Sequence, residues 1–193
     1  DFERAESCIA EGIEIAKTDC PPFVLALCRA NAVQYLSYRG QLDEAMTVNN
    51  ELLGLYRQIG IPDGEQWWGA TATTIALLQG TVGDLADPAG EFADRYPTAS
   101  AWRGAHALAL AEGDRLDEAR DVVERYALDR PERFLIDELI ASAWGYVGLL
   151  ALRLDDPRLG AAAEAWLRPD EHLWVCVQIY NWGPITAMLC AAV

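Results

Sequence analysis

The chain has 193 residues, of which 52% are hydrophobic and 23% charged, and its formal net charge at pH 7 is −15. This length and hydrophobic content are sufficient for a sizeable buried core, and they exclude a disordered tail. The negative charge argues against nucleic acid and anionic membrane surfaces as partners, because both are recognised mainly through lysine and arginine.

The first part of the chain predicts helices, because its apolar residues recur at three- and four-residue steps while strand signals are scarce. Ile9, Ile13 and Ala16 belong to one such stripe. Glycine and proline clusters separate one helix from the next. The helices predicted here cover residues 2–17, 22–39, 42–59 and 65–79.

The second part continues the same alternation, with residues 80–83 as a turn and with Pro88 and Pro157 at helix starts, where proline is tolerated. Residues 172–182 are rich in β-branched side chains and predict an extended segment, followed by a last helix near Pro184. The apolar run 139–152 is too short for a bilayer span, so no transmembrane helix is predicted. The remaining predicted helices cover residues 88–95, 99–112, 115–127, 132–153 and 157–167.

An internal repeat becomes visible when the turns are compared. Residues 40–45 (Gly-Gln-Leu-Asp-Glu-Ala) resemble residues 113–119 (Gly-Asp-Arg-Leu-Asp-Glu-Ala), which have one extra residue after the glycine, and residues 154–161 form a looser copy. The glycine ends one helix, the acidic pair favours the start of the next, and the small alanine permits close packing. We therefore expect repeated helical hairpins that bury their apolar faces on one another.

These turns resemble degenerate tetratricopeptide-like (TPR-like) repeats. The resemblance rests on Gly40, Leu42 and Ala45 and again on Leu116 and Ala119; it departs from the family where Leu36 and Arg57 replace the expected aromatic residue and proline. The predicted fold is an all-α, right-handed solenoid of antiparallel helical hairpins, organised as a single helical-repeat domain over residues 1–193.

A narrower resemblance covers residues 80–193, through the strings at 99–103, 113–120, 134–137 and 181–184. They are similar to the C-terminal helical region of actinobacterial signalling proteins, either LuxR-type transcriptional regulators or nucleotide cyclases, that also carry an ATPase domain. The resemblance implies a regulatory or sensing module whose chain continues into a further repeat. Because the sequence begins without a methionine and stops within an apolar stretch, we expect a piece of a longer multidomain protein.

The sequence contains no motif that is typical of a catalytic or metal-binding site. The five cysteines form no Cys-x-x-Cys pair, so they are interpreted as reduced, buried thiols of a cytoplasmic protein. The two histidines, His106 and His172, have no cysteine or histidine at a zinc-ligand spacing. Neither a nucleophile elbow nor a phosphate-binding loop is present. The sequence therefore predicts no catalytic residue, no metal and no cofactor, and hence no enzyme in this segment.

Seven tryptophans are spread across the predicted hairpins, and most are interpreted as core residues. Trp67 and Trp68 are adjacent, however, and neighbouring residues of a helix point in different directions. One of the two is expected to face a groove, a neighbouring unit or a partner. The TPR resemblance implies a concave surface, with Gln34, Tyr38, Trp67 and Arg103 as its candidate lining; the alternative is that these side chains belong to solvated faces.

Two functions remain open from the sequence. The first is a regulatory protein-interaction domain of a signalling or transcriptional regulator, which contacts another domain of the same protein or a basic protein partner. The alternative is a sensor that binds a small metabolite in the concave groove and controls an attached ATPase or output domain. Neither function involves direct contact with nucleic acid or a membrane.

Overall fold

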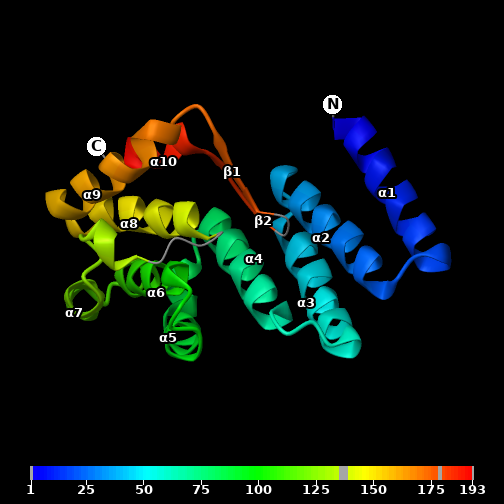
Figure 1. Ribbon diagram of the computed structural model, residues 1–193, viewed down its shortest axis with the longest axis horizontal. Coiled ribbons are helices and arrows are strands. Elements are labelled where there is room, and N and C mark those ends of the chain that lie inside the picture. Colours follow the sequence, from blue (N-terminus) through cyan, green and yellow to red (C-terminus); the bar gives the residue numbers. More distant parts are fainter. Residues whose placement is uncertain (1, 135–138, 178–179, 193) are drawn as a thin grey trace. The chain divides into compact units, whose positions relative to one another are not determined.

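The computed structural model describes residues 2–134, 139–177, 180–192 and is predominantly α-helical (Figure 1). The all-α class predicted from the hydrophobic periodicity is therefore confirmed at this level. The helices are α1 (Phe2–Asp19), α2 (Pro22–Tyr38), α3 (Leu42–Ile59), α4 (Gly64–Gln79), α5 (Ala86–Arg95), α6 (Ser100–Glu112), α7 (Leu116–Tyr126), α8 (Ile140–Leu154), α9 (Pro157–Leu167) and α10 (Ile185–Ala192).

The contacts divide the chain into two compact units, where the sequence alone predicts a single domain over residues 1–193. Of the residues described, 2–79 and 180–181 belong to unit 1, and the others belong to unit 2. Each unit has its own consecutive helix packing.

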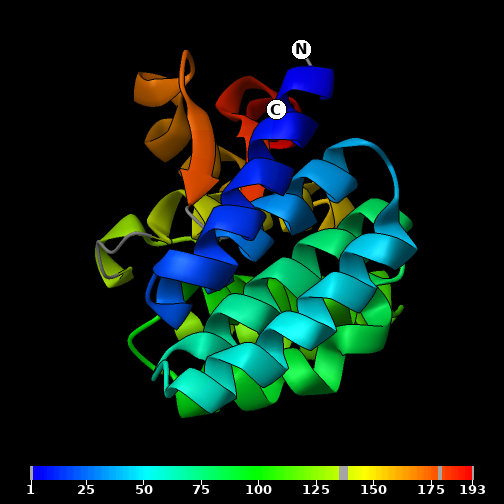
Figure 2. The same cartoon turned by 90° about the vertical axis from the view of Figure 1, so that its right-hand side faces the viewer.

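In unit 1, each helix packs on the next one along the chain, from α1 to α4. Figure 2 shows this order for α2, α3 and α4, whose colours pass from blue through cyan to green. Helix α3 is amphipathic, and it buries Ala45, Asn49, Leu52 and Tyr56 on one face. Ala45 packs with Val33 of α2 and Ile75 of α4 in a small apolar core.

In unit 2, helix α6 lies at the centre and packs against α5, α7 and α8. Its sequence is rich in alanine and includes Gly104, and such small residues allow neighbouring helices to approach closely. Ten of its residues are buried, and within the helix Arg103 and His106 are half-buried and Glu112 is exposed. Helix α8 is buried in the same way and also packs against α9 and α10.

The same turn closes several of these helices. The residue after the last turn adopts a left-handed conformation, and the next backbone N–H donates to the carbonyl five residues earlier, which is the pattern of a Schellman motif. These bonds are Gln41 N–H to Leu36 O, Ile61 N–H to Tyr56 O, Arg115 N–H to Leu110 O, Leu128 N–H to Val123 O and Asp156 N–H to Ala151 O.

The backbone hydrogen bonds align the repeated turns differently from the comparison of their sequences. Gly40 occupies the left-handed position in unit 1 with φ +74°, but the equivalent residue of unit 2 is Asp114 (φ +58°) and not Gly113 (φ −83°). Counted from this position, Leu42 and Leu116 both begin the following helix, so the second turn contains no extra residue. In the looser third copy Asp155 is left-handed, which makes Gly160, and not Ala161, the equivalent of Ala45.

One helix boundary was wrong. The helix predicted for residues 132–153 begins at Ile140, and a 3₁₀ turn occupies Pro131–Arg133. Phe134 follows this turn and stacks on Trp144 of α8, with 4.3 Å between the ring centroids. In a continuous helix Phe134 and Trp144, ten residues apart, would be separated by about 15 Å along the axis, so their ring stacking is incompatible with the longer helix.

The other boundaries agree with the predictions to within about two residues, the usual uncertainty of a helix end. A 3₁₀ turn, Val82–Leu85, precedes α5 and includes part of the predicted 80–83 turn. Residues 172–182 were predicted to be extended; they include strand β1 (Trp174–Val177) and the beginning of β2 (Tyr180–Pro184), which form a two-stranded sheet. Helix α10 starts at Ile185, as predicted from Pro184. Among the residues described, no helix is both long and apolar enough to cross a membrane.

Candidate functional site

The four candidate groove residues are distributed over both units. Gln34 and Tyr38 lie one turn apart on α2 and Trp67 lies on α4, all in unit 1, whereas Arg103 lies on α6 in unit 2. Tyr38 is 48% exposed and Gln34 is half-buried. That these residues line one groove stays a prediction.

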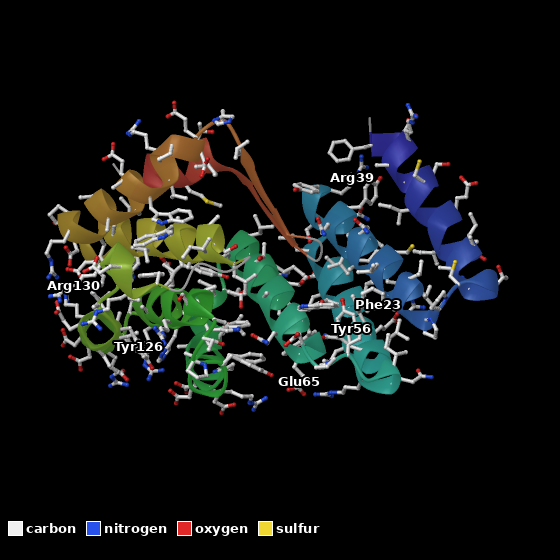
Figure 3. The ribbon with its side chains drawn as sticks, in the orientation of Figure 1. Phe23, Arg39, Tyr56, Glu65, Tyr126 and Arg130 are labelled. Atoms are coloured by element: carbon white, nitrogen blue, oxygen red, sulfur yellow. The ribbon has the colours of Figure 1, made fainter. Side chains whose placement is uncertain are left out.

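Within unit 1, Trp67 contacts the end of α2 that is far from Gln34. Its ring meets Tyr56 edge-on at a centroid distance of 5.5 Å and lies 6.4 Å from Phe23. Phe23 and Tyr56 are labelled on their two helices in Figure 3. Since α2 rises about 1.5 Å per residue, Phe23 and Gln34 are about 16 Å apart along its axis. Gln34 and Trp67 therefore do not form one compact site.

The adjacent tryptophans, one of which was expected to face a groove, a neighbouring unit or a partner, both contact α3. While Trp67 packs on Tyr56, Trp68 donates from Nε1 to Asn50 Oδ1 over 2.9 Å. The backbone carbonyl of Trp68 also accepts a hydrogen bond from the buried Asn49. Both indoles are half-buried, so each keeps a part of its surface accessible. The packing of α4 on α3 thus accommodates both indoles, although they extend in different directions from neighbouring positions of α4.

In unit 2, the polar atoms of Arg103 are directed at its own unit. One terminal nitrogen donates to Pro97 O over 2.6 Å, and the guanidinium lies over the ring of Tyr126, 4.9 Å from its centroid. Tyr126 ends helix α7 and is labelled in Figure 3. Arg103 Nε is buried and has no hydrogen-bond partner. The side chain therefore joins the α5–α6 connection to α7 and leaves one buried donor unused.

An aromatic stack lies on α8 and its neighbours, and no motif of the sequence marks it. Trp144 is fully buried between Phe134, at a centroid distance of 4.3 Å, and Trp166 of α9, at 6.2 Å. Its Nε1 is buried without a hydrogen-bond partner. The sequence contained a weak signal for this stack, since tryptophans recur in consecutive predicted helices, but it could not pair them.

Arg103 and Trp144 are sequence neighbours of residues that make a close contact between α6 and α8. A Cβ atom on Gly104 would lie 3.0 Å from Tyr146 Cβ and 3.3 Å from the carbonyl oxygen of Ala143, so glycine is what permits the approach. Arg103 is next to Gly104 and Trp144 is next to Ala143. Each of the two residues has one buried N–H group without a hydrogen-bond partner, Nε in Arg103 and Nε1 in Trp144.

Charged side chains form a network at the start of α7. Arg115 donates to Asp87 of α5 over 2.7 Å and to both carboxylate oxygens of Glu118. These bonds lower the pKa values of Asp87 and Glu118 below their ordinary values. All three side chains are largely in water, where such pairs contribute little to stability and are screened by salt.

His106 is the partly buried histidine of α6 and packs beneath α5. A Cβ atom on Gly90 would lie 3.0 Å from His106 Nε2, so α5 approaches the imidazole closely. Burial lowers the pKa of His106, and the positive charge of Arg115 lowers it further. The imidazole is therefore more difficult to protonate here than in the unfolded chain.

The part of the chain that the structure describes contains no group of three or more histidine, cysteine, aspartate or glutamate residues that could hold a metal ion. Cys8, Cys20, Cys28 and Cys190 are free thiols, but the prediction that they are buried was wrong: Cys8 and Cys190 are exposed, and Cys20 and Cys28 are half-buried. Comparisons with protein-family models, with curated proteins and with solved structures find no match to this chain.

Proposed function

We propose that this chain is a regulatory protein-interaction domain built from TPR-like helical hairpins, stacked as a right-handed solenoid. The observation that carries the proposal is the repeated turn. Gly40, Asp114 and Asp155 are left-handed, and each is followed by the same backbone hydrogen bond. Five residues later, at Ala45, Ala119 and Gly160, a small buried residue lies in the following helix. Recurrence of one packing unit is the defining property of helical-repeat proteins.

Helix packing within unit 2 supports this proposal. Helices α6 and α8, which precede the turns at Asp114 and Asp155, pack directly on each other. Helices α7 and α9, which follow these turns, pack on α6 and α8 respectively. A repeat array uses the same two contacts, one inside each hairpin and one between successive hairpins.

The exposed carboxylates favour a basic partner. Helix α7 presents Asp117, Glu118, Asp121 and Glu124 to solvent, and the whole chain carries a net charge of −15. Arginines pair with three of these carboxylates, those of Asp117, Glu118 and Glu124, so the attraction for a basic partner rests on the net negative charge. The partner would be another domain of the same signalling protein or a separate protein, in the cytoplasm, with any catalysis located in other domains.

The test is binding of a panel of lysine- and arginine-rich peptides, measured by fluorescence anisotropy at low and at physiological salt. We expect the double variant Asp117→Lys/Asp121→Lys to weaken binding at least tenfold. The matched control is Glu3→Lys/Glu11→Lys on α1, which changes the net charge by the same amount at exposed positions of unit 1.

Three outcomes can be distinguished. Loss of binding in the α7 variant alone supports a contact on α7. Equal loss in both variants would show a response to net charge without a docking surface, and unchanged binding in the α7 variant would contradict the electrostatic contact.

A second function, the sensing of a small effector, is favoured by the two unpartnered donors of unit 2. Native mass spectrometry of the purified chain tests it, because a retained small molecule would be observed directly. A bare chain at low and high protein concentration would favour the interaction domain.

A further inference from the structure

Helix α1 is the least buried helix of unit 1. Among the described residues of α1, Ala16 is the buried one, and Ile9, Gly12 and Ile13 are half-buried. Helix α3 has the same length of 18 residues and buries four of them. Elements with few buried apolar contacts open more easily than the rest of a protein. On this ground α1 is the helix of unit 1 that is fixed least firmly.

The start of α1 contacts the end of α2 through side chains that are open to water. The ring of Phe2 meets Tyr35 edge-on at a centroid distance of 6.2 Å, and the guanidinium of Arg39 lies 5.6 Å from the centroid of Phe2. The hydroxyl of Tyr35 also donates to Glu6 over 2.8 Å. Phe2 is 51% exposed, and Glu6 and Arg39 are exposed as well. Contacts of this kind hold two helices together only weakly.

Further along the chain, α1 approaches α2 at Gly12. A Cβ atom at this position would lie 3.5 Å from Sγ of Cys28, which is an ordinary van der Waals distance. Cys28 and Tyr35 are seven residues apart, which is about two turns, so they lie on one face of α2. Helix α2 has a single charged residue, Arg29. Separation of α1 would therefore expose a largely apolar face of α2.

The other three helices of unit 1 have a core of their own. Val33 of α2, Ala45 of α3 and Ile75 of α4 form a buried cluster, and apolar side chains of α2 and α3 pack around it. Because the cluster draws its members from α2, α3 and α4, its packing is retained when α1 separates.

Cys20 and Pro21 connect the two helices, since α1 ends at Asp19 and α2 begins at Pro22. Each of these two residues is followed by a proline, which disfavours a helical backbone at the residue before it. Pro21 accordingly has an extended conformation, with φ −55° and ψ 143°. The two helices therefore do not merge, and the connection provides a hinge between them.

We infer that α1 is a hinged cover of α2. It separates from α2 as one unit while α2, α3 and α4 stay folded, and it thereby uncovers the face of α2 that carries Cys28 and Tyr35. The competing explanation is a fixed cap, because helical-repeat arrays need a polar helix at their ends. The inference does not depend on the proposed contact of α7, since it uses unit 1 alone.

The test is hydrogen exchange of the backbone amides of the whole chain, followed by NMR at urea concentrations below the unfolding midpoint. A detached helix of this length is marginal in water, so the amides of α1 exchange once it has left α2. We expect the protection of α1 to be about a hundredfold or more below that of α3. Its dependence on urea should also be weaker, because opening exposes less surface than global unfolding does.

A disulfide between α1 and α2 should abolish the opening. The short distance at Gly12 allows Gly12→Cys to pair with Cys28, in a background where the other four cysteines are replaced by serine. When this variant is oxidised, the protection of α1 should rise to about that of α3. The reduced form of the same variant is the matched control and should keep the lower protection of α1.

Two alanine variants test whether the contact at the start of α1 holds the cover closed. Phe2→Ala removes the ring that meets Tyr35 and should lower the protection of α1 about threefold or more. Ile15→Ala is the matched control, because Ile15 is 54% exposed and lies on the opposite side of α1 from Phe2. It should leave the protection of α1 unchanged, and neither variant should change that of α3.

The inference is overturned if α1 shows the same protection and the same urea dependence as α3, because α1 is then a fixed cap. It is also overturned if α2, α3 and α4 lose protection together with α1. If the disulfide leaves the protection of α1 unchanged, its amides exchange by fraying within the helix, which contradicts opening as one unit. Should Gly12→Cys fail to fold, the wild-type exchange and the comparison of Phe2→Ala with Ile15→Ala still decide the question.

Discussion

The turn at Gly40 in unit 1 and the turn at Asp114 in unit 2 have the same backbone geometry but different residues at the left-handed position. In both, the closing hydrogen bond is 2.9 Å long, and the alanine at the following helix start, Ala45 or Ala119, is fully buried. The comparison teaches that the packed alanine and the hydrogen bond define the turn. The residue at the left-handed position is secondary; in unit 2 it is Asp114, whose side chain accepts a hydrogen bond from Arg153 of α8.

The largest expected effect comes from enlarging the buried alanine. Ala45→Leu and Ala119→Leu should each lower the free energy of unfolding by about 2 kcal/mol, because extra methyl groups in a packed interface force their neighbours apart. Urea unfolding measures this change. Ala161→Leu, at an exposed position of α9, is the control and should stay within about 0.5 kcal/mol of the wild type. If Ala119→Leu changes the free energy of unfolding as little as the control does, the two turns are not equivalent.

The next effect concerns the left-handed position itself. A Cβ atom on Gly40 would meet no atom within 4 Å, so the cost of Gly40→Ala is conformational and should be about 1 kcal/mol. Asp114→Gly relieves the backbone but removes the bond to Arg153, and its effect should lie within about 0.5 kcal/mol of zero. Thermal unfolding of the two variants checks this asymmetry, and equal losses in both would refute it.

Protonation of histidine should distinguish the units, because His106 and His172 both belong to unit 2. The pKa of His106 is lowered by burial and by Arg115, while Asp94 and Asp87 act in the opposite direction and Arg125 in the same one. As the pH falls, His106 therefore binds a proton in the unfolded chain before it does so in the folded chain. The contribution of the neutral His106 to stability is fully present above pH 6.5 and is lost as the pH decreases through the lowered pKa of the folded state.

Hydrogen exchange of the backbone amides at pH 7.5 and 5.5 measures this effect. Protection in unit 2 should decrease at the lower pH, and His106→Gln should remove the pH-dependent part. A variant that keeps the full pH dependence would assign the effect to another group.

The smallest effect is expected from Arg115→Gln, which gives the second turn the residue that the first turn has at Gln41. Gln41 is bonded to Glu44, whereas Arg115 joins Asp87 to Glu118. Because Arg115 lowers the pKa values of both carboxyls, its contribution is present above their ordinary values of 3.8 and 4.5 and is lost as the pH falls below them. The urea midpoints at pH 7 and pH 3 should therefore differ less in the variant than in the wild type. At pH 7, high salt should reduce the stability difference between the variant and the wild type.

Much of the fold could be predicted from local signals. Helix α3 was expected at residues 42–59 and is observed at Leu42–Ile59, because glycine and proline clusters stop a helix through their own backbone geometry. The candidate site was less predictable. Trp67 and Gln34 were grouped by the TPR resemblance, but Trp67 packs near Phe23, at the other end of α2. Contacts between side chains of different helices cannot be predicted from the spacing of residues within one helix.

The sequence by itself determined which segments are helical, where most of them end and which turns repeat, since these features depend on residues only a few positions apart. The tertiary structure decided that Asp114 and not Gly113 takes the left-handed position, because the bond to Leu110 and the burial of Ala119 fix the register. It also decided that α8 starts at Ile140, after Phe134 has packed on Trp144, and that the buried N–H donors of Arg103 and Trp144 lack an acceptor. These properties arise from contacts between helices, where close packing leaves room for one arrangement.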